Sequence, residues 1–117
     1  MRVNRRQTGT FYEQIAAEYL QEKGLVILER NFRCRMGEID LITKDGRYFV
    51  FVEVKYRKGS GSGYSFSGVH PKKQKKIIDV AKWYLLTKRC SLDTPCRFDV
   101  VGIDGDQIQW LKNAFET

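Results

Sequence analysis

The sequence predicts an α/β or α+β fold in which helices cover a single β-sheet. The expected elements run helix, three strands, helix, two strands, an order typical of helices packed against one sheet. The run Tyr48–Val52 is apolar on both faces, as in a central strand that is covered on both sides. The length of 117 residues is that of one domain, so we expect residues 1–117 to form a single domain.

Two helices are indicated by their end signals and their apolar faces. Thr10-Phe11-Tyr12-Glu13 fits a capping box and Gly24 is suited to end a helix, which predicts a first helix that begins at Thr10. His70 and Pro71 are suited to begin a second helix. The predicted buried stripe of this second helix consists of Ile77, Ala81, Tyr84 and Leu85, with Gln74 one turn earlier on the same stripe.

The strands are indicated by short apolar segments between turn signals. Asp45-Gly46 is a strong signal for a two-residue hairpin turn. The expected strands are Leu25–Arg33, Gly37–Thr43, Arg47–Tyr56, Phe98–Ile103 and Gln107–Leu111.

Composition and charge favour a water-soluble protein with a polyanionic partner. Hydrophobic residues make up 42% of the chain and charged residues 30%, which excludes a disordered chain. The longest apolar run, Tyr48–Val54, is too short to span a bilayer, and no apolar segment follows the basic N-terminus as in a signal peptide. Three widely spaced cysteines suit free thiols in a reducing compartment better than a Cys90–Cys96 disulfide. We therefore expect a cytoplasmic protein without a membrane partner.

The net charge of +7 is concentrated in one segment. Between Lys55 and Ile78 there is no acidic residue, and seven basic ones equal the net charge of the whole chain. They are Lys55, Arg57, Lys58, Lys72, Lys73, Lys75 and Lys76. A Gly/Ser-rich loop at residues 59–68 interrupts the run, which favours an arm that binds phosphates. A solvated helix face is the competing interpretation.

Acidic and basic side chains follow one another on the central strand. Glu53 and Lys55 continue the face of Phe49 and Phe51, and charged groups are rarely covered unless they are used. A turn at Asp45-Gly46 would pair Asp40 with Phe51 and Glu38 with Glu53. The two acids of the preceding strand would then share a face with Glu53.

Clustered carboxylates repel one another unless a cation lies between them or one of them takes up a proton. A ligand set of oxygen atoms without His or Cys favours Mg²⁺ or Mn²⁺ over zinc. Such an ion can polarise a phosphoryl oxygen, and a nearby lysine can stabilise the charge that develops on phosphorus. A salt bridge of Lys55 with Asp40 or Glu53 is the alternative interpretation.

These motifs resemble a known family. Gly37-Glu38-Ile39-Asp40-Leu41-Ile42 and Phe51-Val52-Glu53-Val54-Lys55 look like the PD-(D/E)xK nuclease motif, with Ile39 in place of its proline. The chain is more closely similar to the YraN-like family of predicted endonucleases, relatives of the archaeal Holliday junction resolvases. That resemblance covers nearly the whole chain and includes Asn31 and Arg97-Phe98-Asp99-Val100-Val101.

The resemblance implies a restriction-endonuclease-like fold, with a central mixed β-sheet flanked by helices, and metal-dependent hydrolysis of DNA. Asp40, Glu53 and the Val54 carbonyl would bind Mg²⁺ or Mn²⁺, and Lys55 would assist the nucleophile. Glu13 matches an acid that related resolvases direct into the site, although a capping role also explains it. Gln74 matches a helix glutamine of the superfamily, or is a buried structural amide.

Other residues near these motifs have more than one interpretation. Glu38 is a candidate auxiliary ligand, and His70 suits a helix cap or a phosphate contact rather than a catalytic base. Arg97 and Asp99 suit a local ion pair.

Three functions remain open from the sequence. The first is a metal-dependent DNA endonuclease with branched or duplex DNA as its partner and a structure selectivity for branched DNA, for which a homodimer would suit a two-fold junction. The DNA-binding residues would be Arg57, Lys58, Lys72, Lys73, Lys75 and Lys76. The second is a nucleic-acid-binding module with a vestigial nuclease site. The third is an interaction protein whose charge asymmetry has no function.

Overall fold

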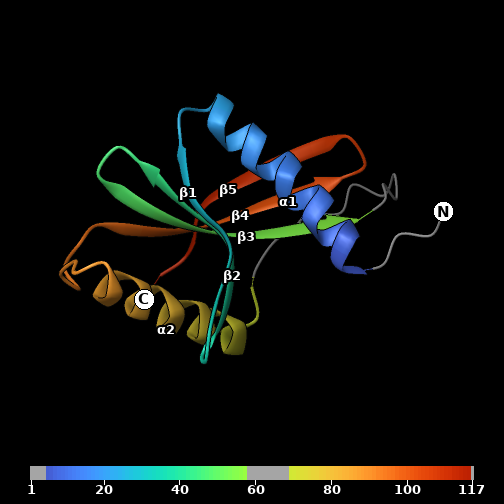
Figure 1. Ribbon diagram of the computed structural model, residues 1–117. Coiled ribbons are helices and arrows are strands. Elements are labelled where there is room, and N and C mark those ends of the chain that lie inside the picture. Colours follow the sequence, from blue (N-terminus) through green and yellow to red (C-terminus); the bar gives the residue numbers. More distant parts are fainter. Residues whose placement is uncertain (1–4, 58–68, 117) are drawn as a thin grey trace.

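The computed structural model describes residues 5–57 and 69–116, and its centre is a five-stranded mixed sheet (Figure 1). The spatial order is β1-β2-β3-β4-β5, with β3 and β4 parallel and the other neighbours antiparallel. The predicted α/β class is confirmed, and the arrangement is consistent with a restriction-endonuclease-like fold. The strands are β1 Val26–Cys34, β2 Gly37–Asp45, β3 Tyr48–Arg57, β4 Cys96–Asp104 and β5 Gln107–Phe115.

The two helices, α1 Arg5–Glu22 and α2 Pro71–Thr87, pack against opposite faces of this sheet (Figure 1). On the α1 side, Ala16, Ala17 and Leu20 meet Val50, Val52 and Val54 of β3. On the α2 side, the predicted stripe meets Phe49 and Phe51. Strand β3 is therefore covered on both faces, as its apolar run predicted.

Helix α1 begins well before Thr10, so the predicted capping box is wrong. The helix starts at Arg5, which places Thr10 inside it rather than at its end. Phe11, the second residue of the predicted box, has 60% of its surface exposed. Tyr12 instead attaches this part of the helix to the sheet by stacking on Tyr56 of β3, with ring centroids 4.3 Å apart.

The β2–β3 hairpin is shifted by two residues from the predicted register. Asp45 pairs with Tyr48, so the turn consists of Gly46 and Arg47 rather than Asp45 and Gly46. Gly46 has φ of +60°, which suits glycine at the first central position of a hairpin turn. Phe51 consequently pairs with Ile42, not with Asp40. Because side chains alternate with a period of two, the shift by itself leaves Asp40 on the predicted face.

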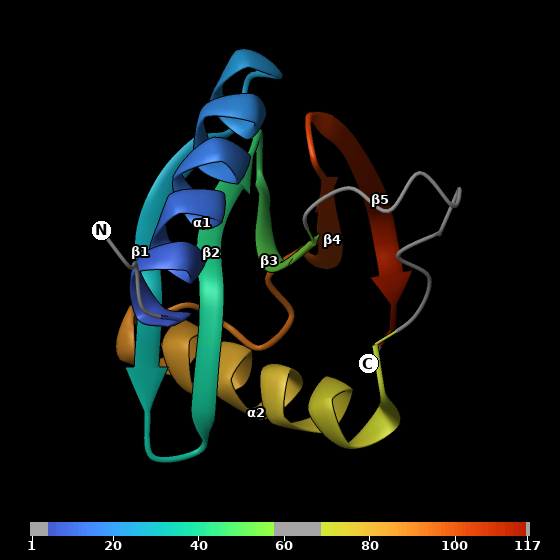
Figure 2. The ribbon, with the colours of Figure 1, turned by 90° about the vertical axis from the view of Figure 1, so that its right-hand side faces the viewer.

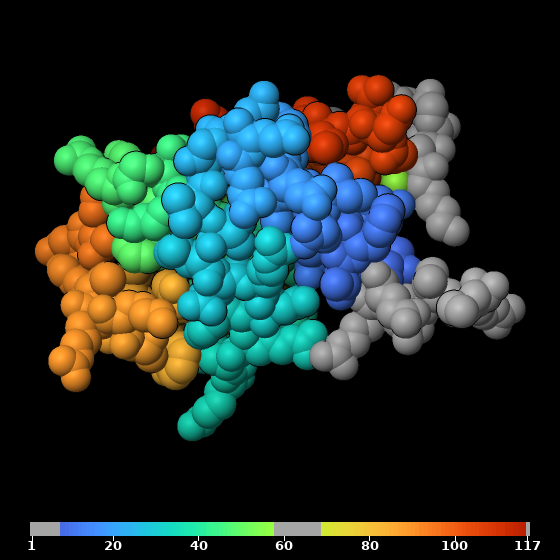
Figure 3. Space-filling model, turned by 45° about the horizontal axis from the view of Figure 1, so that its top comes forward, coloured from blue at the N-terminus to red at the C-terminus, as the bar shows by residue number. Residues whose placement is uncertain are grey.

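Strands β2 and β3 separate beyond the pair Leu41–Val52, the last pair of their ladder. In Figure 1, β1 and β2 turn toward the bottom of the view while β3 continues to the right. Figure 2 shows the end of the β1–β2 hairpin beside α2, and Figure 3 shows its tip projecting from the body of the molecule. Strand β2 also rotates here, since Ile39 packs on the α2 side and Leu41 on the α1 side.

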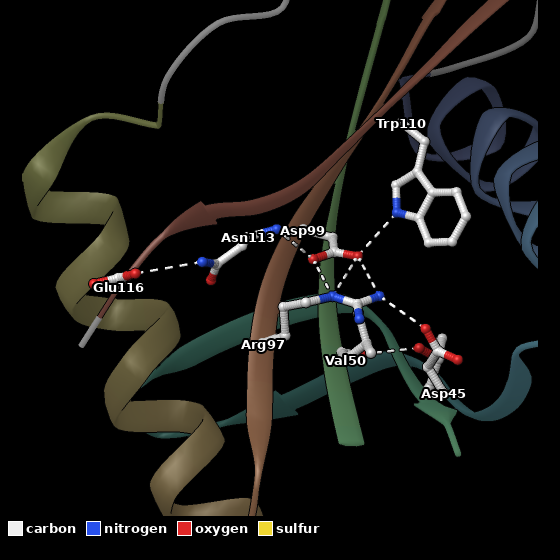
Figure 4. Close-up of polar contacts among 8 residues, drawn as sticks. Asp45, Val50, Arg97, Asp99, Trp110, Asn113 and Glu116 are labelled. Atoms are coloured by element: carbon white, nitrogen blue, oxygen red, sulfur yellow. Dashed lines mark hydrogen bonds and ion pairs between the residues drawn. The ribbon is translucent and has the colours of Figure 1, made fainter. Parts of the chain in front are cut away.

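A buried polar network joins β4 to β5 (Figure 4). Asp99 is fully buried and accepts hydrogen bonds from Arg97, from the Trp110 indole and from the Asn113 backbone N–H. Arg97 also donates to Asp45 at 3.1 Å. The predicted ion pair of Arg97 and Asp99 is confirmed, and it lies where the β4–β5 register is interrupted.

Two further sequence predictions concern the thiols and the membrane. The three cysteines are free thiols, so the alternative disulfide is not formed. Within residues 5–57 and 69–116, neither helix is long and apolar enough to cross a membrane.

Candidate active site

The candidate site lies in the fork where β2 and β3 separate. Asp40 and Glu53 are the first residues beyond the last β2–β3 pair, so they face each other across the fork. The backbone N–H of Val54 donates to Asp40 Oδ2 over 2.8 Å. The Asp40 side chain of β2 thus accepts a hydrogen bond from the backbone of β3 at the point where the two backbones are no longer paired.

Two negative charges in this fork are poorly tolerated. Burial raises the pKa of Asp40 to about 7, and the charge of Glu53 contributes to the rise, while the bond from Val54 opposes it. Glu13 also raises the Asp40 pKa, and Lys73 lowers it. At neutral pH the pair therefore binds a proton or favours a cation.

Glu13 is brought to the same cluster from α1. Burial raises the pKa of Glu13, and the negative charges of Glu38 and Glu53 add to the effect. A hydrogen bond from Asn31 and the charge of Arg33 oppose it. Since Thr10 lies inside the helix, the competing capping role of Glu13 no longer applies. The structure thus brings Glu13 close enough to Asp40 and Glu53 for their charges to affect one another.

Asn31 was matched by the family resemblance but was given no role by the sequence reasoning. It lies in β1 with φ of +50°, a backbone conformation in which asparagine is tolerated better than most residues. An asparagine within a strand is itself unusual. That signal could have marked the position that presents an amide to Glu13.

Glu53 is buried, with 7% of its surface exposed, and it forms an ion pair with Lys73 of α2. The Lys73 Nζ donates to Glu53 Oε1. Sequence reasoning assigned Lys73 to phosphate binding alone. The contact joins residues 20 positions apart in the chain, so no local pattern indicates it.

Lys55 and Val54 follow Glu53 along β3. Lys55 is half-buried and two residues beyond Glu53, which places it on the same strand face. Its backbone is paired with Gly102 of the parallel strand β4. The β3–β4 ladder continues on both sides of the fork and fixes the spacing of Glu53, Val54 and Lys55.

Gln74 and His70 have structural roles at the beginning of α2. The Gln74 side-chain amide donates to the Val69 carbonyl over 2.7 Å, which supports the interpretation as a structural amide. His70 caps the helix, and its Nδ1 accepts the Lys72 N–H, as the sequence predicted.

A positively charged hollow of about 420 Å³ adjoins the carboxylate cluster. Gly37 has φ of +148° at the beginning of β2, a backbone conformation that residues with a side chain rarely adopt, and it lies beside Lys76 and Val80 of α2. The charged lining contains three lysines against one acid. The lining residues are Gly37, Glu38, His70, Lys72, Lys73, Lys76 and Ile77.

The other predicted DNA-binding residues fall into two groups, those in ion pairs with aspartates and those exposed on the hollow. Arg57 is paired with Asp104 at 2.5 Å and is largely covered, and Lys75 is paired with Asp79 on its own helix at 2.9 Å. Lys72 and Lys76 are exposed on the hollow. Lys58 and the Gly/Ser-rich loop lie outside the described residues.

Comparison with known proteins identifies the family. The model of the uncharacterised protein family UPF0102 matches residues 12–103, a range that contains Glu13, Asp40, Glu53 and Lys55. The chain belongs to this family. The resemblance to the YraN-like family is thereby confirmed, because the two names denote the same family.

Relatives in the UPF0102 family extend over nearly the whole chain. A UPF0102 protein of Lachnoclostridium phytofermentans is 46% identical over 114 residues, which are 97% of each chain. One of Herminiimonas arsenicoxydans is 45% identical over 99% of this chain and 92% of its own. One of Legionella pneumophila is 44% identical over 94% of this chain and 95% of its own.

The oxygen ligands in the fork fit a hard divalent ion. Among residues 5–57 and 69–116, no three His, Cys, Asp or Glu side chains form a ready metal cage. Mg²⁺ does not need one, because it keeps several waters and is usually held by one or two carboxylates together with substrate phosphates. Asp40 and Glu53 are such a pair, and burial together with the charge of Glu53 raises the pKa of Asp40 although the charge of Lys73 lowers it.

Proposed function

We propose that this protein is a metal-dependent endonuclease that hydrolyses phosphodiester bonds in DNA. The observation that carries the proposal is the fork, in which Asp40 and Glu53 face each other beside Lys55. The carboxylates are costly to keep together, since the charge of Glu53 opposes the ionisation of Asp40. A cation bound during catalysis would offset the repulsion between the two carboxylates.

Each residue of the fork has a distinct role in this proposal. Asp40, Glu53 and the Val54 carbonyl would hold Mg²⁺ or Mn²⁺, which when bound polarises the phosphoryl oxygen and acidifies water. The Lys55 ammonium would stabilise negative charge as it builds on phosphorus and orient the attacking water. The Glu13 carboxylate, whose pKa is raised, would accept a proton near the fork.

The hollow beside the fork supports DNA as the substrate. Lys72 and Lys76 are exposed there, and Lys73 links the hollow to Glu53. Lysines bind phosphates without reading base sequence, so this surface would position the backbone rather than select a site. Selectivity for branched DNA, and a dimer to act on a two-fold junction, are proposals from the family resemblance.

The second candidate is a nucleic-acid-binding module whose nuclease site is vestigial. One observation favours it, namely that Lys73 already neutralises Glu53 without a metal. The two candidates differ in a single measurable property, because a vestigial site would bind DNA and cut none.

The test is a cleavage screen over branched, duplex and single-stranded DNA with Mg²⁺ or Mn²⁺. The wild type is compared with Asp40→Asn, which keeps an oxygen that can accept the Val54 N–H but removes the charge. The nuclease proposal expects cutting of at least one DNA form, abolished in the variant and in EDTA. Binding without cutting in every form would favour the second candidate, and equal cutting by both proteins would exclude Asp40 as a ligand.

A further inference from the structure

Lys73 connects two surfaces that the proposed function treats separately. Its side chain is 54% exposed, yet its ammonium reaches a Glu53 side chain that is only 8% exposed. The same lysine lines the positively charged hollow together with Lys72 and Lys76. Lys73 therefore lies within reach of both a buried carboxylate and any phosphate that enters the hollow.

The charges around Lys73 hold its ammonium at the fork when no other ion is present. Burial alone would lower the pKa of Lys73, but the hydrogen bond and charge of Glu53, with the charges of Asp40 and Glu38, raise it. The ammonium is thus the cation that balances the buried carboxylate.

A divalent ion at Glu53 and the Lys73 ammonium repel each other. If the ion enters, the ammonium must leave Glu53 and find another anion, or return to water. A DNA phosphate in the hollow would supply that anion beside the two neighbouring lysines. Metal binding alone gives the displaced ammonium no new anion, and DNA binding alone gives Glu53 no new cation.

We propose that Lys73 is an internal counter-ion that moves from Glu53 to a DNA phosphate when the metal binds. This inference rests on the proposed function and adds its regulation. Each ligand then raises the affinity of the other by the same factor, as linkage requires. Without DNA the protein therefore binds the metal more weakly, because its own lysine already occupies Glu53.

Calorimetric titration with Mn²⁺ tests the proposal on the whole protein. Lys73→Met removes the competing charge, and Lys73→Arg retains it. Lys82→Met is the control, because it removes an exposed lysine of the same helix that does not line the hollow. Each protein is titrated alone and with a short phosphorothioate duplex, which keeps the backbone charge and resists hydrolysis. Thermal unfolding of each variant verifies that it is folded.

We expect Lys73→Met without DNA to bind Mn²⁺ about tenfold more tightly than wild type, within the usual range of coupling factors. Lys82→Met and Lys73→Arg should bind Mn²⁺ as the wild type does. The duplex should raise Mn²⁺ affinity in the wild type, and by much less in Lys73→Met.

Unchanged or weaker Mn²⁺ binding by folded Lys73→Met would overturn the counter-ion role. If the wild type nevertheless cuts DNA in the cleavage screen, the proposed function survives that result. Absence of Mn²⁺ binding in every protein, with and without DNA, would overturn both proposals.

Discussion

Replacing Asp40 with asparagine should stabilise the metal-free protein at alkaline pH. The pKa of Asp40 rises from 3.8 to about 7 on folding, first because of burial and then because of Glu53. Between these two values the folded state binds a proton that the unfolded state has released. The free energy of unfolding therefore falls as the pH rises through this window.

The size of the effect follows from the difference between the two pKa values. At about 1.4 kcal/mol per pKa unit, the full difference corresponds to at most about 4 kcal/mol above pH 7. Asparagine keeps an oxygen for the Val54 N–H and carries no charge at any pH. Asp40→Asn and the wild type should thus be about equally stable near pH 4, with the variant more stable by up to about 4 kcal/mol at pH 8.

Urea unfolding in EDTA at pH 4, 5.5, 7 and 8 measures this difference. Asp93→Asn is a suitable control, because Asp93 is exposed and its backbone N–H, rather than its carboxylate, is bonded to Ser91. A difference between Asp40→Asn and the wild type that does not change with pH would refute the reasoning. When Mn²⁺ replaces EDTA at pH 8, the free energy of unfolding should rise for the wild type and stay nearly unchanged for Asp40→Asn.

Three further outcomes are expected. Lys55→Ala should bind DNA and Mn²⁺ as wild type does in calorimetry, but cut on the order of a hundredfold more slowly in single-turnover assays, by analogy with deleting one transition-state donor. The double variant Lys72→Ala/Lys76→Ala should reduce the slope of log affinity for duplex DNA against log salt concentration, measured by fluorescence anisotropy, by about 0.9 for each phosphate that is no longer neutralised. Lys75→Ala should change this slope less, because Lys75 is paired with Asp79 of its own helix. Asp99→Ala should cost about 3–5 kcal/mol in urea unfolding, because it leaves a largely covered Arg97 without its main partner; a destabilisation under about 1 kcal/mol would contradict that role.

The sequence could predict the faces of the site but not its register. The apolar run of β3 indicated a central strand, and the period of two placed Glu53 and Lys55 on one side. The hairpin turn was placed one position too early, because Asp45-Gly46 is a common turn pair, whereas the structure uses Gly46 as the first central residue. The two-residue shift brings Asp40 level with Glu53 rather than diagonal to it.

Local sequence patterns could not predict contacts between segments that are far apart in the chain. The Lys73–Glu53 ion pair depends on where α2 lies against the fork, and the spacing of residues along the chain does not fix that position. The length of α1 was also misjudged, because Thr10 and Glu13 fit a capping box although the helix continues before them. The buried stripe of α2 was predictable, since its helical period is fixed by geometry.

The fork combines a structural and a chemical role in the same side chain. Where β2 leaves β3, the Val54 N–H has no backbone partner in β2, and a buried donor without a partner is costly. The Asp40 carboxylate replaces that partner at 2.8 Å, so the strands can separate without an unsatisfied N–H group. An amide could accept the same bond without charge repulsion from Glu53. The stability of the fold therefore does not explain why an acid with a pKa raised to about 7 occupies this position, whereas the proposed metal site would explain it.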